Sequence, residues 1–286
     1  MESTCLLCYN TYYKFAQEDT DMKQFGFIGM GNMGYAILKG LLKTVAPDQL
    51  IFSARNKEHM EQVKAETGVS YAADNAGCAR ESACLVLAVK PQQFDTVIGE
   101  IRDVITKDQI IISIAPGITI KDLQERFGTA CRIVRAMPNT PALVGEGMTG
   151  VCYDRSQFSD KEEQTIRMLF TSFGRMTVVE EKLMDAVVCA SGSSPAYVYM
   201  FMEALADSAV KYGIPRAAAY ELVAQTVLGS AKMLLETGEH PGLLKDKVCS
   251  PGGTTIAGVA ALEEYGMRNA IMKATDACYA KCQGIK

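Results

Sequence analysis

A glycine-rich turn, Gly29-Met30-Gly31-Asn32-Met33-Gly34, carries the clearest chemical signal in this chain. The apolar run Phe25–Ile28 precedes the turn, and a helical pattern over Tyr35–Leu42 follows it. Between a strand and a helix, the first glycine makes the tight turn, the second lets the backbone approach a pyrophosphate, and the third lets the helix pack on the strand. Free N–H groups at the helix N-terminus also favour phosphate. We therefore predict that Ile28 and the residues of this turn contact a dinucleotide.

The residues that follow the next predicted strand indicate which dinucleotide is bound. At this place, roughly 20 residues beyond the glycine turn, an Asp or Glu would bind the ribose 2′-hydroxyl of NAD. The chain instead reads Ser53-Ala54-Arg55-Asn56-Lys57, and its first acid, Glu58, comes late. The planar guanidinium of Arg55 can pair with a 2′-phosphate, and Ser53 and Asn56 can add hydrogen bonds. We predict NADP(H) as the preferred cofactor and NAD(H) as the alternative, in which case Arg55 is only a solvated surface cation.

Two further predicted strands should end beside the glycine turn. Their ends read Ala88-Val89-Lys90-Pro91 and Ser113-Ile114-Ala115-Pro116-Gly117. Parallel sheets of this kind bind ligands at the carboxyl edge of their strands, so we predict cofactor contacts from Ala88 to Pro91 and from Ala115. Beside a polyanion, Lys90 is expected to neutralise charge or support the loop rather than to act as a catalytic lysine.

A second turn, Ser250-Pro251-Gly252-Gly253-Thr254-Thr255, leads into an apolar helical segment near the C-terminus. The start of such a helix offers an anion site that suits a carboxylate, and Thr255 adds a hydroxyl that can donate or accept a hydrogen bond. A simpler interpretation is that Thr254 or Thr255 only caps the helix, and spacing alone favours capping.

Short β-rich runs alternate with helical patterns through the first two thirds of the chain. Runs such as Leu85–Val89 and Ile110–Ile112 are apolar without alternation, as strands buried on both faces are. We therefore predict an α/β Rossmann-type doubly wound, mostly parallel sheet over residues 22–182. The predicted strands are Gln24–Ile28, Leu50–Ser53, Ala83–Val89, Gln109–Ile114, Arg132–Arg135, Gly150–Tyr153 and Met176–Val179.

Ala-rich helical segments replace the strands over residues 183–286, which we predict to form an all-α dimerisation domain. One helix is expected from an N-cap at Ser194 to a stop at Gly213, and a second from about Pro215 to a stop at Gly238. The first helix is apolar nearly all round, so we expect a second chain to supply neighbours that bury it. Its apolar residues include Tyr197, Val198, Tyr199, Met200, Phe201, Met202 and Leu205.

Length and charge exclude several classes of protein. The 286 residues are enough for about two domains of roughly 150 residues each. Because the net charge is −4 and no Lys/Arg-rich run occurs, we expect no nucleic-acid partner. No apolar stretch reaches the roughly 18 to 20 residues that span a bilayer, so we expect no membrane partner.

The ten cysteines are scattered through predicted strands and helices, where reduced cysteine behaves as a small hydrophobe. This distribution favours a reducing, cytoplasmic location. Cys5 and Cys8 form a C-x-x-C pair, and Cys278 and Cys282 are spaced i, i+4. The two histidines lie near neither pair, and a four-ligand zinc site would require the chain ends to meet, so we predict no metal site.

Residues 1–21 are expected to form a separate N-terminal extension. They contain four acids, a single base at Lys14 and no long apolar segment, which fits neither a secretory signal nor an Arg-rich transit peptide. We assign no role to the extension. The predicted domains are therefore the extension at 1–21, an NAD(P)-binding domain at 22–182 and the helical domain at 183–286.

Motifs in this chain occur in the order seen in the pyrroline-5-carboxylate reductase family, which the chain closely resembles over Met22 to about Gln283. The segment Asp246–Glu263 resembles that family's own signature, and the residues before Met22 are the main departure. The motifs are Gly26-Phe27-Ile28-Gly29-Met30-Gly31-Asn32-Met33-Gly34, Ala88-Val89-Lys90-Pro91, Met137-Pro138-Asn139-Thr140-Pro141, Ser191-Gly192-Ser193-Ser194-Pro195-Ala196 and Ser250-Pro251-Gly252-Gly253-Thr254-Thr255.

The resemblance implies an oxidoreductase that reduces the cyclic imine of L-1-pyrroline-5-carboxylate to L-proline with NAD(P)H, the last step of proline biosynthesis. It also implies a homo-oligomer of intertwined dimers and a small-molecule substrate held by the loop Gly252–Thr255. Further residues follow from the same resemblance. The substrate pocket is expected to include Ser191, Gly192 and Ser193, and additional cofactor contacts are expected from Asn75, Asn139 and Thr140.

The chemistry of imine reduction is consistent with these residues. Hydride addition to a protonated C=N bond requires a carboxylate anchor and a hydrogen-bond partner for the ring nitrogen. The backbone N–H groups of Gly253, Thr254 and Thr255 can anchor the carboxylate. The Thr255 hydroxyl is the candidate catalytic group, and it either protonates the ring nitrogen or only positions it, since threonine is a weak acid.

Three alternatives compete with this interpretation. β-Hydroxyacid dehydrogenases have a similar glycine turn but place a catalytic lysine in the second domain, and Ser193–Ala204 contains no lysine. A sensor that binds NADP without turnover would not need the small-residue loops near Ser191 and Gly252. Glu203 and Asp207, spaced i, i+4, could hold a metal ion, but without histidine nearby they are expected to pair with Lys or Arg.

Overall fold

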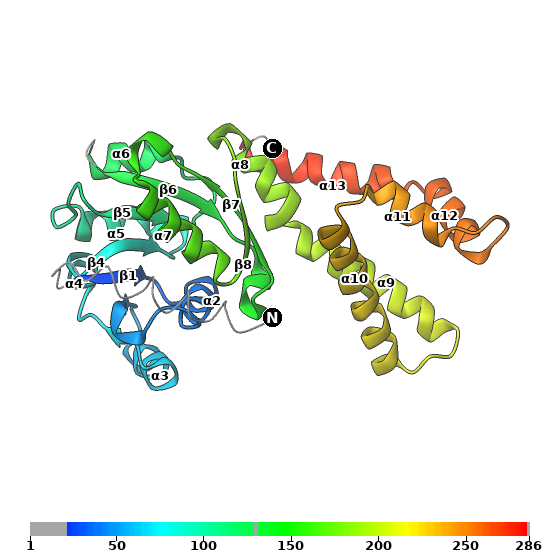
Figure 1. Cartoon of the computed structure of the whole chain (residues 1–286), viewed down its shortest axis with the longest axis horizontal. Helices are drawn as coiled ribbons and strands as arrows, with labels where there is room; N and C mark the ends of the chain where they lie inside the picture. The colour runs from blue at the N-terminus through cyan, green and yellow to red at the C-terminus, as the bar shows by residue number, and fades with distance from the viewer. Residues whose placement is uncertain (1–21, 129–130, 285–286) are drawn as a thin grey trace, which may run out of the picture. The chain divides into compact units, whose positions relative to one another are not determined.

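The computed structural model describes residues 22–128 and 131–284. The described residues form two compact units (Figure 1). Unit 1 runs to Ala136 and adds Ala142–Gly147 and Val151–Met176, whereas unit 2 holds Met137–Pro141, Met148–Gly150 and the chain from Thr177 onward. The predicted N-terminal extension lies outside the described residues, and the domain boundaries at 22–182 and 183–286 stay a prediction.

The chain forms an eight-stranded sheet in the order β3-β2-β1-β4-β5-β6-β7-β8. The order of the first six strands is that of dinucleotide-binding folds, with a topological switch point between β1 and β4. The strands are β1 (Lys23–Ile28), β2 (Leu50–Ser53), β3 (Ser70–Tyr71), β4 (Ser82–Leu87), β5 (Ile110–Ser113), β6 (Arg132–Met137), β7 (Gly147–Cys152) and β8 (Gly174–Val178). The helices of this region are α2 (Asn32–Leu41), α3 (Lys57–Thr67), α4 (Asn75–Arg80), α5 (Phe94–Ile101), α6 (Ile120–Phe127) and α7 (Asp160–Thr171).

The register of the parallel strands aligns their carboxyl ends. Ile28 at the end of β1 pairs with Ser53 of β2 on one side and with Leu87 of β4 on the other, and Leu87 pairs in turn with Ser113 of β5. The loops that follow β1, β2, β4 and β5 therefore leave the sheet at a single edge. The predicted Rossmann-type fold is confirmed, and every strand predicted from the sequence is present.

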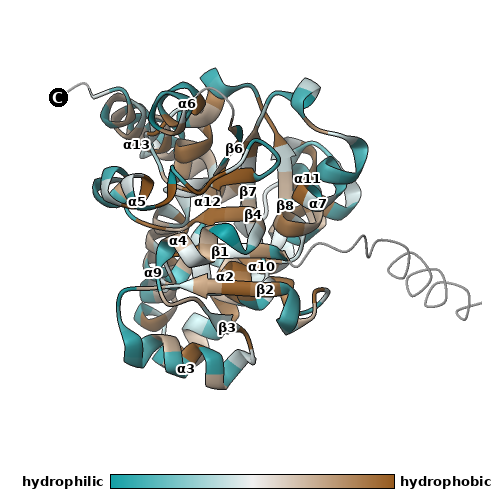
Figure 2. Cartoon of the chain, turned by 90° about the vertical axis from the view of Figure 1, so that its left-hand side faces the viewer, coloured by the Kyte–Doolittle hydropathy of each residue, from teal (hydrophilic) through white to brown (hydrophobic). Residues whose placement is uncertain are grey.

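The core of unit 1 lies on both faces of the sheet. Alternate residues of β4 belong to two separate apolar clusters, with Cys84 and Val86 in one and Leu85 and Leu87 in the other. Alternation of side chains between the two faces of a strand explains why these runs need no polar positions. Figure 2 shows the central strands β2 and β4 as hydrophobic and much of the outlying α3 as hydrophilic. Burial raises the pKa of the Cys84 thiol to about 12, so this cysteine is an inert part of the core.

Unit 2 is helical after β8. A π-helical turn, η6, links α8 to α9, and buried Ala206 of α9 packs with Ala219 and Val223 of α10. Asp207 forms an ion pair with Arg216, as expected for an acid that pairs with a base rather than with a metal. The elements are α8 (Met184–Val187), η6 (Val188–Gly192), α9 (Ser194–Lys211), α10 (Arg216–Thr237), α11 (Pro241–Val248), α12 (Thr254–Glu264) and α13 (Met267–Cys282).

The predicted ends of α9 and α10 are largely confirmed. Gly213 and Gly238 have φ angles of +97° and +66°, the left-handed conformation that stops a helix and favours glycine. The predicted N-cap at Ser194 is wrong, because Ser193 occupies that position without a capping hydrogen bond. The Ser194 hydroxyl instead donates to the Ala190 carbonyl at 2.7 Å, since η6 continues almost directly into α9.

Several apolar side chains of α9 are exposed in the single chain. The exposed fraction is 69% for Met200 and 59% for Tyr199, and Leu222 and Leu228 on α10 are also more than half exposed. Monomeric proteins rarely leave so much apolar surface in water, so these helices favour contact with another chain. Among the described helices, none has both the length and the apolar character required to cross a bilayer.

Candidate active site

The glycine-rich turn lies at the switch point of the sheet. Gly29 follows β1 with φ of +95°, and a Cβ atom there would lie 2.6 Å from the carbonyl oxygen of Ala88 after β4. A Cβ atom on Gly34 would overlap the carbonyl oxygen of Gly29, so the first turn of α2 packs directly on the loop. These two glycines are therefore required by close backbone packing.

Gly31 differs from the other two glycines of the motif. It is the N-cap residue of α2, and no side chain caps this helix end. Apart from its neighbours along the chain, a Cβ atom on Gly31 would have no protein atom within 4 Å. The absence of a side chain leaves open space in front of uncapped backbone N–H groups. A dinucleotide pyrophosphate fits this arrangement, because the helix N-terminus supplies donors and a positive dipole end. Asn32 and Met33 begin the helix, and Met30 is buried.

Arg55 is exposed directly after β2, where a 2′-phosphate is expected. The Gln93 side-chain amide is oriented with its oxygen toward Arg55. In this orientation the two terminal nitrogens of Arg55 donate to that oxygen at 2.7 and 2.9 Å. This pairing holds the guanidinium above the carboxyl edge of the sheet. Gln93 follows Pro91 in the turn η2 (Pro91–Gln93), and only the fold brings the two side chains together.

Ser53 and Asn75 form a connected pair beneath this edge. The buried Ser53 hydroxyl donates to the Asn75 side-chain oxygen at 2.7 Å, and the Asn75 amide nitrogen donates to Glu100 at 2.6 Å. Ser53 therefore orients Asn75, while Asn56 accepts a hydrogen bond from the backbone of His59 and caps α3. Their predicted contacts with a cofactor stay predictions.

His59 was not singled out from the sequence, yet it contacts the glycine turn. Its Nε2 atom lies 2.7 Å from the carbonyl oxygen of Met30. The contact ties α3 to the loop between β1 and α2, so His59 is a positioning residue for the turn. No sequence signal marks it, because a lone histidine on a helix has no fixed partner until the sheet is assembled.

The loops after β4 and β5 complete the edge in unit 1. Ala88 and Val89 are half-buried, Lys90 is exposed and precedes Pro91, and Ala115 is buried after β5. The backbone carbonyl of Ala88 lies against Gly29 and its small side chain lies against Gly34, so this loop packs closely on the glycine turn. Lys90 is the exposed cation among these loop residues. Together with Arg55 it could neutralise the charge of a phosphate-bearing ligand at this edge of the sheet.

In unit 2, the buried Asn139 side chain hydrogen-bonds to two separate segments of the chain. Its amide nitrogen donates to the carbonyl oxygen of Ser191 at 3.0 Å, and its side-chain oxygen accepts from the backbone N–H of Met148 at 2.8 Å. Asn139 therefore joins β7 to η6 through both polar atoms of its side chain. Thr140 next to it is exposed. Asn139 thus supports the predicted substrate residue Ser191, and a direct contact with nicotinamide stays a prediction.

Gly192 and Ser193 continue the η6 segment. A Cβ atom on Gly192 would lie 3.0 Å from the terminal carbon of Met137, so a larger residue would displace that methionine. The Ser193 hydroxyl accepts a hydrogen bond from the Cys278 thiol at 3.3 Å. The predicted substrate residues Ser191–Ser193 therefore form one short π-helical segment with small side chains.

The predicted cap of α12 is wrong. The helix begins at Thr254, its N-cap is Gly253, and no side chain makes a capping hydrogen bond. Gly252 has φ of +69°, which turns the chain so that Gly253 donates to the Ser250 carbonyl at 3.0 Å. Thr254 and Thr255 are exposed within the first helical turn, where their side chains cannot cap. The free N–H groups at this helix end remain available to an anion.

The two groups of predicted substrate residues lie apart within one chain. η6 contacts the C-terminal part of α13 through Cys278, whereas α12 joins α13 at its first residues (Figure 1). The 16 residues of α13 span roughly 24 Å at 1.5 Å per residue. Ser191–Ser193 and Gly252–Thr255 are therefore not brought together by unit 2 alone.

Comparisons with known proteins agree with this arrangement. Residues 181–285 match the family model for pyrroline-5-carboxylate reductase dimerisation, and residues 24–117 match the model for NADP oxidoreductase, coenzyme F420-dependent. The pyrroline-5-carboxylate reductase of Escherichia coli is 45% identical over 265 residues, covering 92% of this chain and 98% of that protein.

Two solved structures have the same fold over nearly the whole chain. A pyrroline-5-carboxylate reductase from Coxiella burnetii has a TM-score of 0.86 and 34% identity, covering 93% of this chain and 99% of that one. The pyrroline carboxylate reductase of Plasmodium falciparum with NADP bound has a TM-score of 0.81 and 32% identity, with the same coverage of each chain. The sequence motifs, the fold and these relatives together show that the chain belongs to the pyrroline-5-carboxylate reductase family.

Proposed function

We propose that this chain reduces L-1-pyrroline-5-carboxylate to L-proline with NADPH, as the last step of proline biosynthesis. The observation that carries the proposal is the similarity, across nearly the whole chain, to reductases named for this substrate. The site residues are consistent with that activity. The glycine turn suits a dinucleotide, and the start of α12 suits a small carboxylate.

The residues at the edge of unit 1 fit the cofactor. Bound NADPH would supply a hydride to the imine carbon. The glycine turn and the N–H groups of α2 would bind its pyrophosphate, and Arg55, held by Gln93, would pair with its 2′-phosphate. Lys90 would add positive charge. The absence of an early acid after β2 removes the usual partner of the NAD ribose, so NADPH is preferred to NADH.

The start of α12 is proposed as the substrate anchor. The uncapped backbone N–H groups of Thr254 and Thr255 lie in the first turn of α12 and would bind the substrate carboxylate. The Gly253 N–H, which the sequence also suggested as an anchor, already donates to the Ser250 carbonyl. The Thr255 hydroxyl makes no capping bond, so it is free to hydrogen-bond the ring nitrogen and position the imine. Its weak acidity favours positioning over proton donation.

A complete substrate pocket requires a second copy of the chain in this proposal. Ser193 contacts the C-terminal part of α13, whereas Gly252–Thr255 lie at the start of α12, which precedes α13. The helices α9 and α10 expose apolar side chains such as Met200 and Leu222. An intertwined dimer would cover these helices and place the α12 loop of one copy near η6 of the other. We therefore propose a homo-oligomer built from such dimers.

A cytoplasmic location is proposed for the enzyme. The described cysteines are free thiols, of which five are buried, and a reducing compartment keeps such residues unpaired. The cofactor domain at 22–182 and the helical domain at 183–286 are proposed as the functional division, although the last residues before Glu181 already pack with the helices of unit 2.

The decisive experiment measures oxidation of NADPH with L-1-pyrroline-5-carboxylate, with NADH in a parallel reaction. We expect substrate-dependent turnover and a higher kcat/KM with NADPH than with NADH. A folded, dimeric protein that binds NADPH but does not reduce the imine would overturn the proposed activity. Faster turnover with NADH would overturn only the cofactor preference.

A further inference from the structure

Three cysteine thiols of unit 2 converge on one point of the fold. Cys189 lies in η6, and Cys278 and Cys282 lie one turn apart on α13. Their Sγ atoms are all within 4.8 Å of one another. The i, i+4 spacing places the last two on one helix face, and packing of η6 against α13 adds the third. The chain ends need not meet, because the third sulfur comes from the middle of the chain.

The spacing of these sulfurs is close to that of a metal–thiolate centre. A Zn–S bond of about 2.3 Å places neighbouring sulfurs roughly 3.7 to 4.0 Å apart in tetrahedral or trigonal geometry. Sulfurs separated by at most 4.8 Å therefore reach this geometry after side-chain shifts of less than about 1 Å. Soft thiolates select ions such as Zn²⁺ and Cu⁺ over hard cations.

The other described cysteines have no such arrangement. Cys78, Cys84, Cys131 and Cys152 are buried at separate places in the chain's sheet domain, and Cys249 lies before the α12 loop. Among the described residues, only the cluster in unit 2 brings three potential ligands together. Filling the core with small apolar side chains explains the scattered cysteines, but it does not require three sulfurs to face one another.

The surroundings of the cluster are polar on one side. The Cys278 thiol donates to the Ser193 hydroxyl at 3.3 Å, so a polar group lies beside this sulfur. Asp185 lies nearby and accepts a hydrogen bond from Gln283 at 2.5 Å, which places a carboxylate beside the sulfurs.

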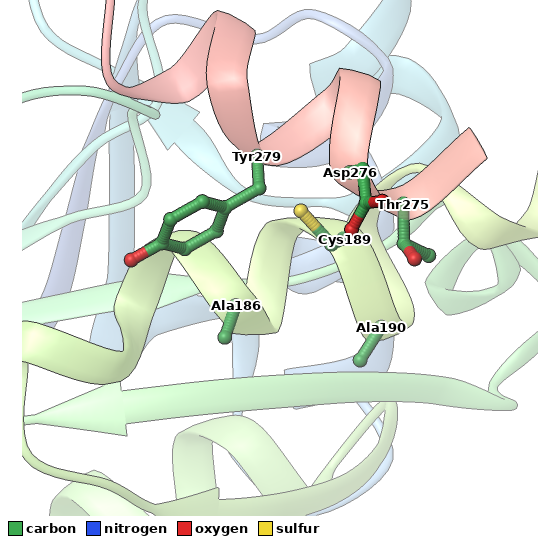
Figure 3. Close-up of a pocket in the computed structure, with 6 residues that line it drawn as sticks. All are labelled: Ala186, Cys189, Ala190, Thr275, Asp276 and Tyr279. Carbon is green, nitrogen blue, oxygen red and sulfur yellow. The ribbon is translucent and has the colours of Figure 1, made fainter. Parts of the chain in front are cut away.

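An opening to the surface adjoins the cluster. A pocket of about 340 Å³ is lined by Cys189 and Ala190 from η6 and by Thr275, Asp276 and Tyr279 from α13. In Figure 3 the Cys189 sulfur points from its helix toward α13, between the side chains of Tyr279 and Asp276. Cys189 is 6% exposed, yet its sulfur borders this pocket and an ion has a path to it.

We propose that Cys189, Cys278 and Cys282 form a binding site for one thiophilic d¹⁰ metal ion, Zn²⁺ or Cu⁺, ligated by three thiolates. Cu⁺ is satisfied by three sulfurs in a trigonal plane, and Zn²⁺ takes a fourth ligand, a water from the adjoining pocket. Binding releases the thiol protons to solvent. The ion would fasten η6 to the end of α13, and this proposal does not depend on the enzymatic activity.

The test uses the full-length chain, reduced and stripped of metal, in equilibrium with Zn²⁺ and a chromophoric chelator. Cys282→Ser is the main variant because Cys282 is half-buried. The double variant Cys5→Ser/Cys8→Ser is the matched control, since it removes the chain's C-x-x-C pair and leaves the cluster intact. We expect one tight ion per chain in the wild type and in the control, and at least 100-fold weaker binding in Cys282→Ser.

A parallel titration with Cu⁺ under anaerobic conditions distinguishes the two ions. The ion that binds more tightly should also raise the melting temperature of the wild type and leave that of Cys282→Ser unchanged. Equal affinity in the wild type and Cys282→Ser, for both ions, would overturn the site. Binding that disappears only in the Cys5/Cys8 double variant would assign the metal to the N-terminal pair and overturn it as well.

Protection from alkylation provides a readout that needs no variant. Bound metal should slow the reaction of Cys278 and Cys282 with iodoacetamide at least tenfold, as measured by peptide mass spectrometry, and leave Cys249 unaffected. If Cys278 and Cys282 are alkylated at the same rates with and without metal, the proposal is contradicted. This measurement remains decisive where a cysteine substitution prevents folding.

Discussion

Thr255 is proposed to bind substrate because its side chain makes no capping hydrogen bond at the start of α12. A threonine at a helix start usually caps the helix, but here Gly253 is the N-cap and the threonine lies inside the first turn. The glycines before it place the backbone so that N–H groups and the hydroxyl share one end of α12. The residue is thus left for a ligand rather than used for the stability of the helix.

Replacing Thr255 with Ala should lower kcat/KM for the imine roughly 10- to 100-fold, because one hydrogen bond to a charged ring nitrogen is lost. Thr255→Ser should restore most of the activity. Steady-state kinetics measure both variants, and Thr171→Ala, at an exposed threonine in the last turn of α7, is the control. Unchanged kcat and KM in Thr255→Ala would remove the hydroxyl from the site.

Arg55 illustrates how a neighbour turns a flexible surface cation into an oriented one. Gln93 accepts two hydrogen bonds from its guanidinium, and this limits the positions that the charge can occupy. The sequence places Arg55 at the correct distance from the glycine turn, but Gln93 is 38 positions away (93 − 55) and could not be assigned to it.

Arg55→Ala should reduce kcat/KM with NADPH roughly 10- to 100-fold and leave the value with NADH nearly unchanged, because only NADPH carries the 2′-phosphate. The ratio of the two constants is the relevant measurement. Arg102→Ala, an exposed arginine after α5, controls for general loss of positive charge. If NADPH keeps its full advantage in Arg55→Ala, the residue does not read the 2′-phosphate.

At the scale of elements, the turn between β1 and α2 contains three glycines, and each is required for a different structural reason. Gly29 requires a left-handed backbone and closeness to Ala88, and Gly34 permits contact between α2 and the turn. Gly31 alone faces open space. Packing of the protein against itself therefore accounts for two of the glycines, and a ligand accounts for the third.

Gly34→Ala and Gly31→Ala should separate stability from cofactor binding. Gly34→Ala adds a methyl group where none fits, so we expect about 1–3 kcal/mol of destabilisation and a lower melting temperature. Gly31→Ala should keep the melting temperature of the ligand-free protein and weaken NADPH binding at least tenfold, as measured by calorimetry. Normal NADPH affinity in Gly31→Ala would show that the open space is not used by the cofactor.

Strands buried on both faces could be predicted well from the sequence, whereas the two-residue strand and the helix caps could not. The strand at Leu50–Ser53 was predicted with the bounds that the structure has, because both of its faces are buried. The two-residue β3 was missed, since Ser70 and Tyr71 become a strand only by pairing with β2. The cap of α12 was wrong because several neighbouring small residues could each serve as N-cap.

At the scale of the whole molecule, the helical unit has too little apolar surface buried for its composition. Buried residues of the α9 and α10 pair are few, and side chains such as Met200 remain in water in a single chain. The match to a dimerisation family over residues 181–285 accounts for this surface. Assembly and substrate binding are linked in this proposal, because the two substrate loops of one chain do not meet.

Met200→Glu should weaken the dimer and lower activity together, because a charge would be buried at the apolar contact. Sedimentation velocity at several concentrations measures the shift toward monomer, and the NADPH assay measures the loss of turnover. Ala65→Glu on the exposed face of α3 adds the same charge in unit 1 and should change neither. A Met200→Glu protein that stays dimeric would place the interface elsewhere.

The sequence by itself determined the class of fold, the dinucleotide turn and the family, because these depend on local spacing of glycines and on the period of apolar residues. Only the tertiary structure decided which distant side chains meet. It joined Arg55 to Gln93, His59 to the turn, and Cys189 to Cys278 and Cys282. Such pairs are set by how helices pack on a sheet or on one another, and local sequence carries no record of that packing.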